Sequence, residues 1–175
     1  MEKTIKSRIA YRGPFFLIRE HEIEFPDGEK GKRMVLEHPG AVAAVPITVD
    51  GGILLVKQYR KAVEKETLEI PAGKIEPGET LRDCVNRELM EETGYRAGKL
   101  TFLISYYPSC GISSEIIHIF LAEDLREATG RNPDEHFLGR TILPLEKAQR
   151  MIREGDIRDS KTIIALRELE HRGRI

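Results

Sequence analysis

The stretch from residue 68 to residue 95 most constrains what this chain can fold into. Leu68-Glu69-Ile70-Pro71 is typical of the end of a buried strand, and a glycine-containing loop follows it. A helix is expected to begin near Thr80, which can cap it, with Asp83 close to the positive end of the helix dipole. Gly94 supplies the usual helix stop. The sequence therefore predicts a strand, a loop and a helix in direct succession.

This helix separates an apolar stripe from an acidic face. The stripe consists of Leu81, Val85 and Leu89. Glu88 lies three residues before Glu91 and four before Glu92, so three carboxylates meet within about one helical turn. For an isolated Glu-x-x-Glu-Glu, an ordinary solvated face is the better interpretation. If the face has a function, its like charges favour a bound cation, and all-oxygen ligands select Mg²⁺ or Mn²⁺ rather than zinc. Such ions indicate phosphoryl chemistry.

The residues around these glutamates decide between the two interpretations. Gly73, Glu79, Arg87 and Gly94 stand at fixed offsets from them, and residues 73–95 together resemble the Nudix box. Tyr95 is a small departure, because an aliphatic residue is more usual there. The resemblance implies a Nudix hydrolase with an α/β fold, an α/β/α sandwich around a mixed sheet.

The same resemblance implies roles for individual residues. Glu88, Glu91 and Glu92 would be metal ligands, together with the carbonyl of Ala72, and the expected ion is Mg²⁺, with Mn²⁺ possible. The loop opened by Gly73 would fold back against the helix, where Glu79 and Arg87 hold it or reach the metal shell.

Short motifs outside the box resemble the ADP-ribose pyrophosphatase subgroup. They are His38-Pro-Gly-Ala-Val, Gln58-Tyr59-Arg60, Leu68–Gly73, Tyr107–Gly111, Glu115 and Asp159-x-Lys-Thr. The resemblance implies hydrolysis of ADP-ribose to AMP and ribose 5-phosphate. Ser109-Cys110-Gly111 departs from the Ser-Pro-Gly of the subgroup, and this departure bears on substrate preference. The alternatives are a pyrophosphatase for another nucleotide sugar or a dinucleotide, such as GDP-mannose or NADH, or a non-catalytic Nudix ligand sensor.

Three further residues are candidates for substrate chemistry. Glu115 is at the position where the subgroup has a mobile acidic residue, which acts as general base or as an added metal ligand. Arg60 ends a buried strand and could bind a phosphate through two hydrogen bonds, although a salt bridge to Glu69 is the alternative. Arg33 could reach the substrate across a dimer, and Lys32 is the alternative to it.

The rest of the chain is expected to form one N-terminal β region and one larger domain. Residues 1–40 predict antiparallel strands around a Pro26-Asp27-Gly28 turn, too few to fold alone. Such a sheet packs on the following domain or pairs with another subunit, and we expect a dimerisation element of a homodimer. Residues 41–175 would form the Nudix domain. Its remaining elements are expected as strands at 41–49, 53–56, 100–107 and 116–122, a polar stretch at 123–137, and helices at about 144–154 and 160–172.

Composition argues against several classes of protein. The chain has 28 basic and 29 acidic residues and a formal net charge of -1, so no basic field indicates a nucleic-acid partner or a membrane surface. No apolar run approaches membrane-spanning length. The two cysteines, Cys84 and Cys110, are too few for a disulfide framework, which favours a cytoplasmic protein.

Overall fold

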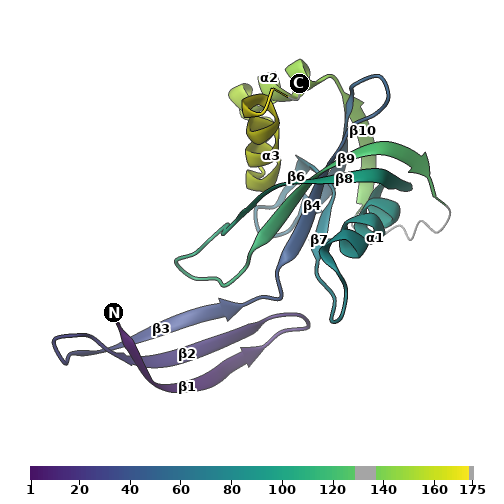
Figure 1. The fold of residues 1–175 in the computed structure, drawn as a ribbon. Coiled ribbons are helices and arrows are strands. Elements are labelled where there is room, and N and C mark those ends of the chain that lie inside the picture. Colours follow the sequence, from purple (N-terminus) through teal and green to yellow (C-terminus); the bar gives the residue numbers. More distant parts are fainter. Residues whose placement is uncertain (129–136, 174–175) are drawn as a thin grey trace. The chain divides into compact units, whose positions relative to one another are not determined.

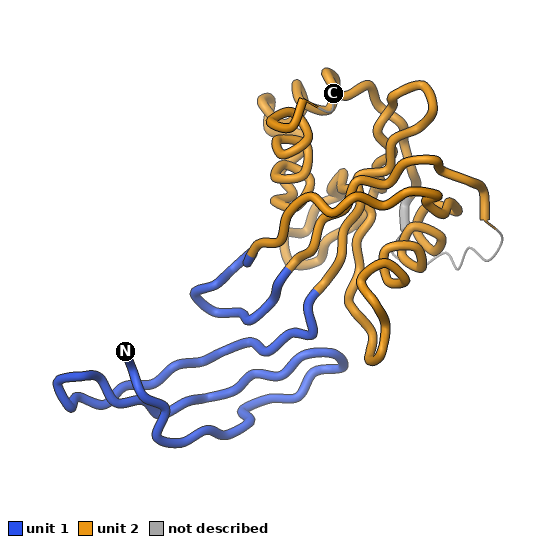
Figure 2. The backbone as a smooth tube through the Cα atoms, in the orientation of Figure 1, with its two compact units in different colours: residues 1–40, 107–116 blue, residues 41–106, 117–175 orange. Residues whose placement is uncertain are grey.

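Residues 1–128 and 137–173 are described by a computed structural model of this chain. They form two compact units, shown in Figure 2. One unit comprises Met1–Gly40 and Tyr107–Ile116, and the other comprises Ala41–Tyr106 and Ile117–Ile175. The first unit thus contains a loop from the middle of the chain as well as the N-terminal β region. No helix in the described part of the chain is both long and apolar enough to cross a bilayer.

The first unit contains a three-stranded antiparallel sheet in the order β1-β2-β3, shown in Figure 1. Its strands are β1 (Lys3–Arg12), β2 (Leu17–Glu24) and β3 (Lys30–Glu37). The predicted turn joins β2 to β3, and Gly28 there adopts a φ of 87°, which glycine tolerates best. The backbone of Leu36 forms two hydrogen bonds with the loop of residues 107–116. It donates to the carbonyl of Ile112 at 2.8 Å and accepts from the N–H of Ser114 at 2.9 Å. The predicted antiparallel strands are confirmed.

A four-stranded mixed sheet lies in the middle of the second unit, in the order β7-β4-β9-β8. Its strands are β4 (Ala41–Pro46), β7 (Ala72–Lys74), β8 (Tyr95–Tyr106) and β9 (Ile117–Glu127). β4 runs parallel to β9, and the other two pairs are antiparallel. Side chains alternate along β4. Ala41, Ala43 and Val45 belong to one buried cluster, and Val42 and Ala44 to another. Both faces of this sheet are therefore covered.

A second, antiparallel sheet has the order β10-β5-β6. Its strands are β5 (Ile53–Arg60), β6 (Lys65–Glu69) and β10 (Phe137–Leu143). A tight turn at Asp50-Gly51-Gly52 precedes β5, and the N–H of Thr48 donates to the carbonyl of Gly52 at 2.8 Å. β4 and β5, before and after this turn, belong to different sheets, because β5 pairs with β6 and β10.

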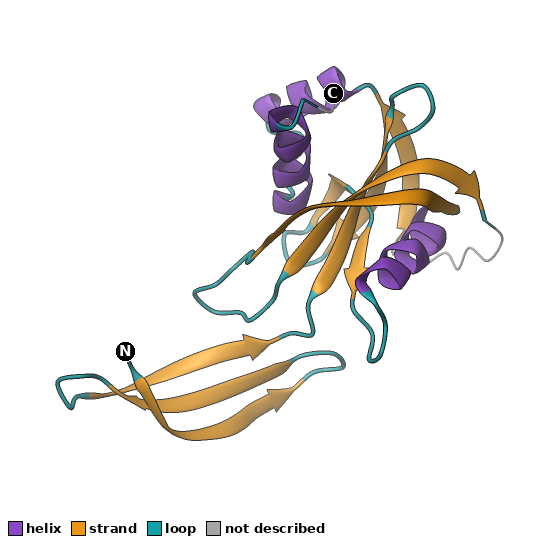
Figure 3. Ribbon diagram, in the orientation of Figure 1, coloured by secondary structure: helices purple, strands orange, loops and turns teal. Residues whose placement is uncertain are grey.

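Three helices complete the layers in the described part of the second unit (Figure 3). They are α1 (Leu81–Thr93), α2 (Leu145–Glu154) and α3 (Ser160–His171). α1 packs on one face of the mixed sheet through the cluster that contains Val42, whereas α2 and α3 contribute to the cluster that contains Ala43. The predicted α/β/α arrangement with a mixed sheet is confirmed. The predicted caps of α1 are also confirmed: Thr80 accepts from the N–H of Asp83 at 3.2 Å, and Gly94 has a φ of 76°.

Strand boundaries differ from the prediction in the second half of the chain. β8 begins directly after α1, at Tyr95 rather than at residue 100, and β9 continues to Glu127. The stretch 123–137, predicted as polar, therefore includes the end of β9 and the first residue of β10; residues 129–136 lie outside the described part. Polar composition misled the prediction because these strand ends pair charged side chains at the surface. Lys99 and Glu123, for example, form an ion pair of 2.7 Å.

Candidate active site

The acidic face of α1 carries the three glutamates predicted as metal ligands. Glu88 and Glu91 both accept hydrogen bonds from Nη1 of Arg87, at 2.7 and 3.3 Å. Glu92 instead contacts β5 and β7. Burial raises the pKa of Glu88, and Arg87 opposes this effect only in part. The helix thus brings the three carboxylates to one region, but it gives them different partners.

Arg87 connects α1 to the loop before it. Its Nε and Nη2 each donate to one oxygen of Glu79 at 2.9 Å, and Nη2 also donates to the carbonyl of Lys74 at 3.1 Å. Hydrogen bonds from Arg87 are the largest cause of the pKa of Glu79 being lowered to about 2. A two-bond arginine–carboxylate pair is stronger than a simple surface ion pair. It holds the loop between Gly73 and Thr80 on the helix.

Gly73 provides the space in which Glu88 lies. A Cβ atom added at residue 73 would overlap the carboxylate of Glu88. Gly73 pairs with Val42 in the middle sheet, so the backbone of β7 is fixed where it meets the glutamate. A side chain at this position would have to displace either the strand or the carboxylate. Close approach, rather than an unusual backbone conformation, explains this glycine.

Glu92 is held by one donor from each of two strands. Its Oε1 accepts from Nε2 of Gln58 at 2.6 Å, and its Oε2 accepts from the backbone N–H of Ala72 at 3.0 Å. Burial raises the pKa of Glu92 to about 7, and repulsion from Glu88 acts in the same direction. Ionising Glu92 is therefore costly in this environment, and a nearby cation would reduce that cost.

The donor set fits a hard divalent cation, although its side chains are not arranged around one. In the described residues, no three Asp, Glu, His or Cys side chains gather as metal ligands would. Arg87 explains this, because its guanidinium contacts both Glu88 and Glu91. Carboxylates and a backbone carbonyl are the ligands that Mg²⁺ and Mn²⁺ prefer. The raised pKa values of Glu88 and Glu92 indicate carboxylates that lack sufficient compensating charge.

Arg60, the predicted phosphate ligand, forms the salt bridge that was its alternative role. Its Nε and Nη2 donate to the two oxygens of Glu69 at 2.8 and 2.6 Å. Glu69 is buried, but the side chain of Arg60 is 45% exposed. Both residues line a pocket of about 810 Å³ together with Asp159 and Lys161. One edge of the Arg60 guanidinium is therefore fixed by Glu69, and the side chain still lines this pocket.

Two predicted residues lie in the first unit. Arg33 donates to Glu2 at 2.9 Å and lies over the ring of Phe25, 5.4 Å from its centroid. Glu115 lies 3.6 Å from Nδ1 of His38, and its backbone N–H donates to the hydroxyl of Ser113 at 3.1 Å. Both side chains thus have partners within that unit.

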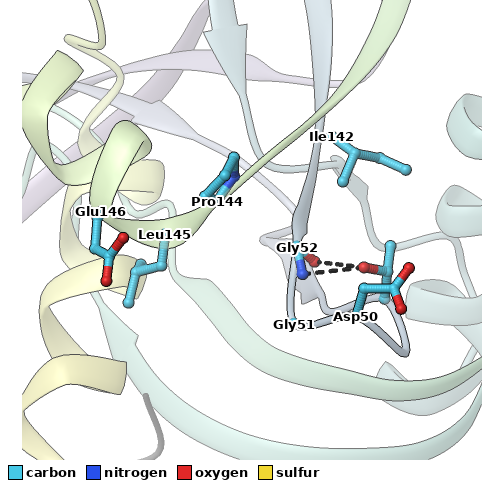
Figure 4. A pocket seen from close by; sticks show the side chains of 8 residues that line it. Asp50, Gly51, Gly52, Ile142, Pro144, Leu145 and Glu146 are labelled. Carbon is cyan, nitrogen blue, oxygen red and sulfur yellow. Dashed lines mark hydrogen bonds between the residues drawn. The ribbon is translucent and has the colours of Figure 1, made fainter.

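Another pocket of the second unit, of about 620 Å³, lies at the turn between β4 and β5 and the start of α2 (Figure 4). Its lining residues are Thr48, Asp50, Gly51, Gly52, Ile142, Pro144, Leu145 and Glu146. The hydroxyl of Thr48 both donates to and accepts from the backbone of Gly52, so these groups satisfy each other. Because none of its lining residues was predicted as a site residue, this pocket is not the candidate site.

Sequence reasoning did not predict the contacts of Gln58 and Lys161. Gln58 follows the buried run Ile53–Val56 and bonds Glu92, and Lys161 is only 7% exposed at the start of α3. Both belong to the short motifs quoted above, but a motif does not show which side chains meet. A polar residue next to a buried run was the available signal, because such a residue needs a partner.

Comparison with known families and proteins agrees with this geometry. Residues 37–166 match the NUDIX domain family, and residues 2–36 match the nucleoside diphosphate sugar hydrolase N-terminal domain. A protein of Bacillus methanolicus named methanol dehydrogenase activator is 43% identical over 97% of this chain and 92% of its own length. A protein of Bacillus subtilis named ADP-ribose pyrophosphatase is 39% identical, with the same coverage of both chains.

A solved structure described as ADP compounds hydrolase has the same fold. It superposes with a TM-score of 0.87, is 26% identical, and covers 99% of this chain and 97% of its own. The NUDIX match covers most of the residues, including the loop, the helix and the glutamates described above. The chain therefore belongs to the Nudix family and is a Nudix hydrolase.

Proposed function

We propose that this protein hydrolyses the pyrophosphate of ADP-ribose to AMP and ribose 5-phosphate with the help of Mg²⁺. The observation that carries the proposal is the set of three glutamates on α1, two of which have pKa values raised by burial. Nudix hydrolases generally use divalent metal ions, and carboxylates of this kind suit Mg²⁺. The relative named ADP-ribose pyrophosphatase spans 97% of this chain, which supports the choice of substrate.

Glu88, Glu91 and Glu92, with the carbonyl of Ala72, would hold the metal. Bound there, the ion would neutralise the diphosphate and lower the pKa of a water molecule. Gln58 donates to Glu92 and keeps that carboxylate oriented. Four box residues support this arrangement: Gly73 makes room for Glu88, Glu79 and Arg87 fix the loop, and Gly94 ends the helix.

The remaining proposed roles concern the substrate and the proton. Arg60 would donate to a phosphate from N–H groups that do not contact Glu69. A guanidinium has five N–H groups, and Arg60 uses its Nε and Nη2 atoms on Glu69. Arg33 would contact the substrate across a dimer. Glu115 would take the proton of the attacking water as that water forms its bond to phosphorus and the bridging P–O bond breaks. Glu92 would belong to the catalytic set as well as to the metal ligands.

Replacing Glu92 with Gln tests the core of this proposal. The amide keeps one oxygen acceptor for the N–H of Ala72, and Gln58 can reverse its own amide, so the fold should remain. We expect Mg²⁺-dependent release of AMP from ADP-ribose to be abolished. Glu170→Gln, at an exposed ion pair on α3, is the control and should keep its activity. Unchanged turnover in Glu92→Gln would contradict the assignment.

A panel of substrates tests the choice of ADP-ribose. It should include GDP-mannose, NADH and dinucleoside polyphosphates, because the box recognises the diphosphate rather than the base. If one of these compounds is cleaved faster than ADP-ribose, that compound and not ADP-ribose is the preferred substrate. Tight binding of ADP-ribose in Mg²⁺ without any AMP formed would indicate a ligand sensor instead.

We further propose a cytoplasmic homodimer in which residues 1–40 form the dimerisation element and residues 41–175 the Nudix domain. Supporting this, Ile5, Tyr11 and Met34 are large apolar side chains about half exposed on the strands of the first unit. A three-stranded sheet without a second layer in its own unit gains stability when another surface covers it.

A further inference from the structure

The motif Asp159-x-Lys161-Thr162 meets the buried carboxylate of Glu69 at the start of α3. Glu69 is 2% exposed, at the end of β6, and a carboxylate in such a place requires several donors. Three side chains donate to it: Arg60, Lys161 and Thr67. Burial alone would raise the pKa of Glu69, but hydrogen bonds from Arg60 and the charge of Lys161 outweigh it and lower the pKa to about 2. Glu69 is therefore a permanent anion at the neutral pH of the cell.

Lys161 is itself fixed from the other side. Its Nζ donates to Glu69 and also to Oδ1 of Asp159 at 3.0 Å. Oδ2 of Asp159 caps α3 by accepting from the N–H and the hydroxyl of Thr162, at 2.9 and 2.6 Å. The hydroxyl of Thr162 accepts in turn from the N–H of Ile70 at 2.9 Å. Asp159, Lys161 and Thr162 thus each bond two partners, which leaves Lys161 little freedom to move.

These contacts form one path from α3 to Arg60. Arg60 uses Nε and Nη2 on Glu69, its side chain is 45% exposed, and it lines the pocket of about 810 Å³. We propose that Lys161 is a positioning residue for Arg60: it holds Glu69 in the orientation that aims the free edge of the guanidinium at a substrate phosphate. The inference rests on the proposed function, in which Arg60 contacts that phosphate.

Charge explains why a lysine suits this position better than an apolar residue. Arg60 and Glu69 alone would be a neutral pair, and the carboxylate would offset much of the attraction of Arg60 for a phosphate. Lys161 neutralises part of the negative charge of Glu69, so Glu69 weakens the attraction between Arg60 and a bound phosphate less. Asp159 pairs with Lys161 on the side away from Glu69, so Arg60, Glu69, Lys161 and Asp159 together comprise two cations and two anions and carry no net charge.

Steady-state kinetics of Lys161→Met with ADP-ribose and Mg²⁺ is the first test. Methionine keeps most of the side-chain volume but removes the donor. We expect KM to rise about tenfold while kcat changes by less than about threefold, because the contact is to a bound phosphate rather than to the reacting water. Lys161→Arg should recover part of the loss. Lys99→Met, which removes a lysine from an exposed ion pair elsewhere in the unit, is the matched control.

A double-mutant cycle distinguishes positioning from a merely structural role. If Lys161 acts through Arg60, the effect of Lys161→Met on KM should disappear in an Arg60→Ala background. The same rise in KM in both backgrounds, or a loss confined to kcat, would overturn the inference. Absence of AMP formation by the wild-type protein would instead refute the proposed function, so the two failures are distinguishable.

Thr67→Val provides the test if Lys161→Met does not fold. The hydroxyl of Thr67 donates to Oε1 of Glu69 at 2.6 Å, and its removal leaves no charge unpaired. We expect a smaller rise in KM, about threefold, that also disappears when Arg60 is replaced with Ala. A rise that persists without Arg60 would contradict the path from Glu69 to Arg60.

Discussion

The carboxylate of Glu88 fills the space that a Cβ atom on Gly73 would occupy. The two residues lie on different elements, β7 and α1, and their close contact requires a residue without a side chain at position 73. The glycine of the box thereby has a steric reason.

Gly73→Ala should destabilise the fold because the new methyl group overlaps Glu88. The atoms that overlap are at the far end of the flexible Glu88 side chain, which can move aside, so we expect the free energy of unfolding to fall by about 1 kcal/mol, at the low end for overpacked sites. Replacing Glu88 with Ala in the same protein removes the overlap, so this double variant should regain most of that loss in urea unfolding. Simple additivity of the two substitutions would show that the contact does not limit the packing.

Arg87→Lys should weaken the attachment of the loop to α1. A lysine ammonium cannot reproduce the two parallel bonds that Arg87 makes to Glu79, although it keeps the charge. We expect a loss of stability of about 1–2 kcal/mol and at least a tenfold fall in kcat/KM for ADP-ribose. Arg167→Lys, at an exposed ion pair on α3, should change neither quantity. Wild-type activity of Arg87→Lys would mean that the paired geometry is dispensable.

Glu69 should make folding stability depend on acid pH. Its pKa is about 2 in the folded protein against an ordinary value of 4.5, so the unfolded chain binds more protons between these values. The stabilisation is complete above pH 4.5 and is lost as the pH falls towards 2, on the order of 3 kcal/mol in all.

The difference in unfolding free energy between wild type and Glu69→Gln measures this term. It should shrink as the pH is lowered through that window. A pH-independent difference for Glu69→Gln would contradict the prediction.

Divalent cations should stabilise the folded protein if the glutamates of α1 bind them. At 100 times its dissociation constant, Mg²⁺ would contribute about 2.7 kcal/mol and raise Tm by roughly 5–10 °C. Glu92→Gln should lose most of this shift, whereas Glu170→Gln should retain it. Differential scanning calorimetry with Mg²⁺ or EDTA measures the shift, and an equal response in both variants would place the ion elsewhere.

Dimerisation should depend on the strands of the first unit. Sedimentation at micromolar concentration should give twice the chain mass of 19.9 kDa for the wild type. Tyr11→Glu places a charge at a residue that is 55% exposed in the single chain, and we expect it to favour the monomer. Val49→Glu, at an exposed residue of the second unit, is the control. A wild type that remains monomeric would remove the dimer from the proposal.

Local chemistry allowed the sequence alone to predict much of this protein. Thr80 caps the start of α1 and Gly94 caps its end, as their capping preferences predict. The spacing of Glu88, Glu91 and Glu92 puts three carboxylates on one face of the helix. The apolar alternation and turn residues of the first forty positions predicted the antiparallel strands. These features depend on neighbours a few residues apart, which a sequence displays directly.

Only the tertiary structure decided which distant groups meet. Gln58 lies 34 residues from Glu92, and Lys161 lies 92 residues from Glu69, and no local pattern specifies either contact. The predicted end of β9 was wrong for the same reason, because strand pairing with β8 rather than composition extends it to Glu127. The sequence thus determined which carboxylates α1 carries, whereas packing of β5, β6 and β7 determined the partners of Glu92 and Arg60.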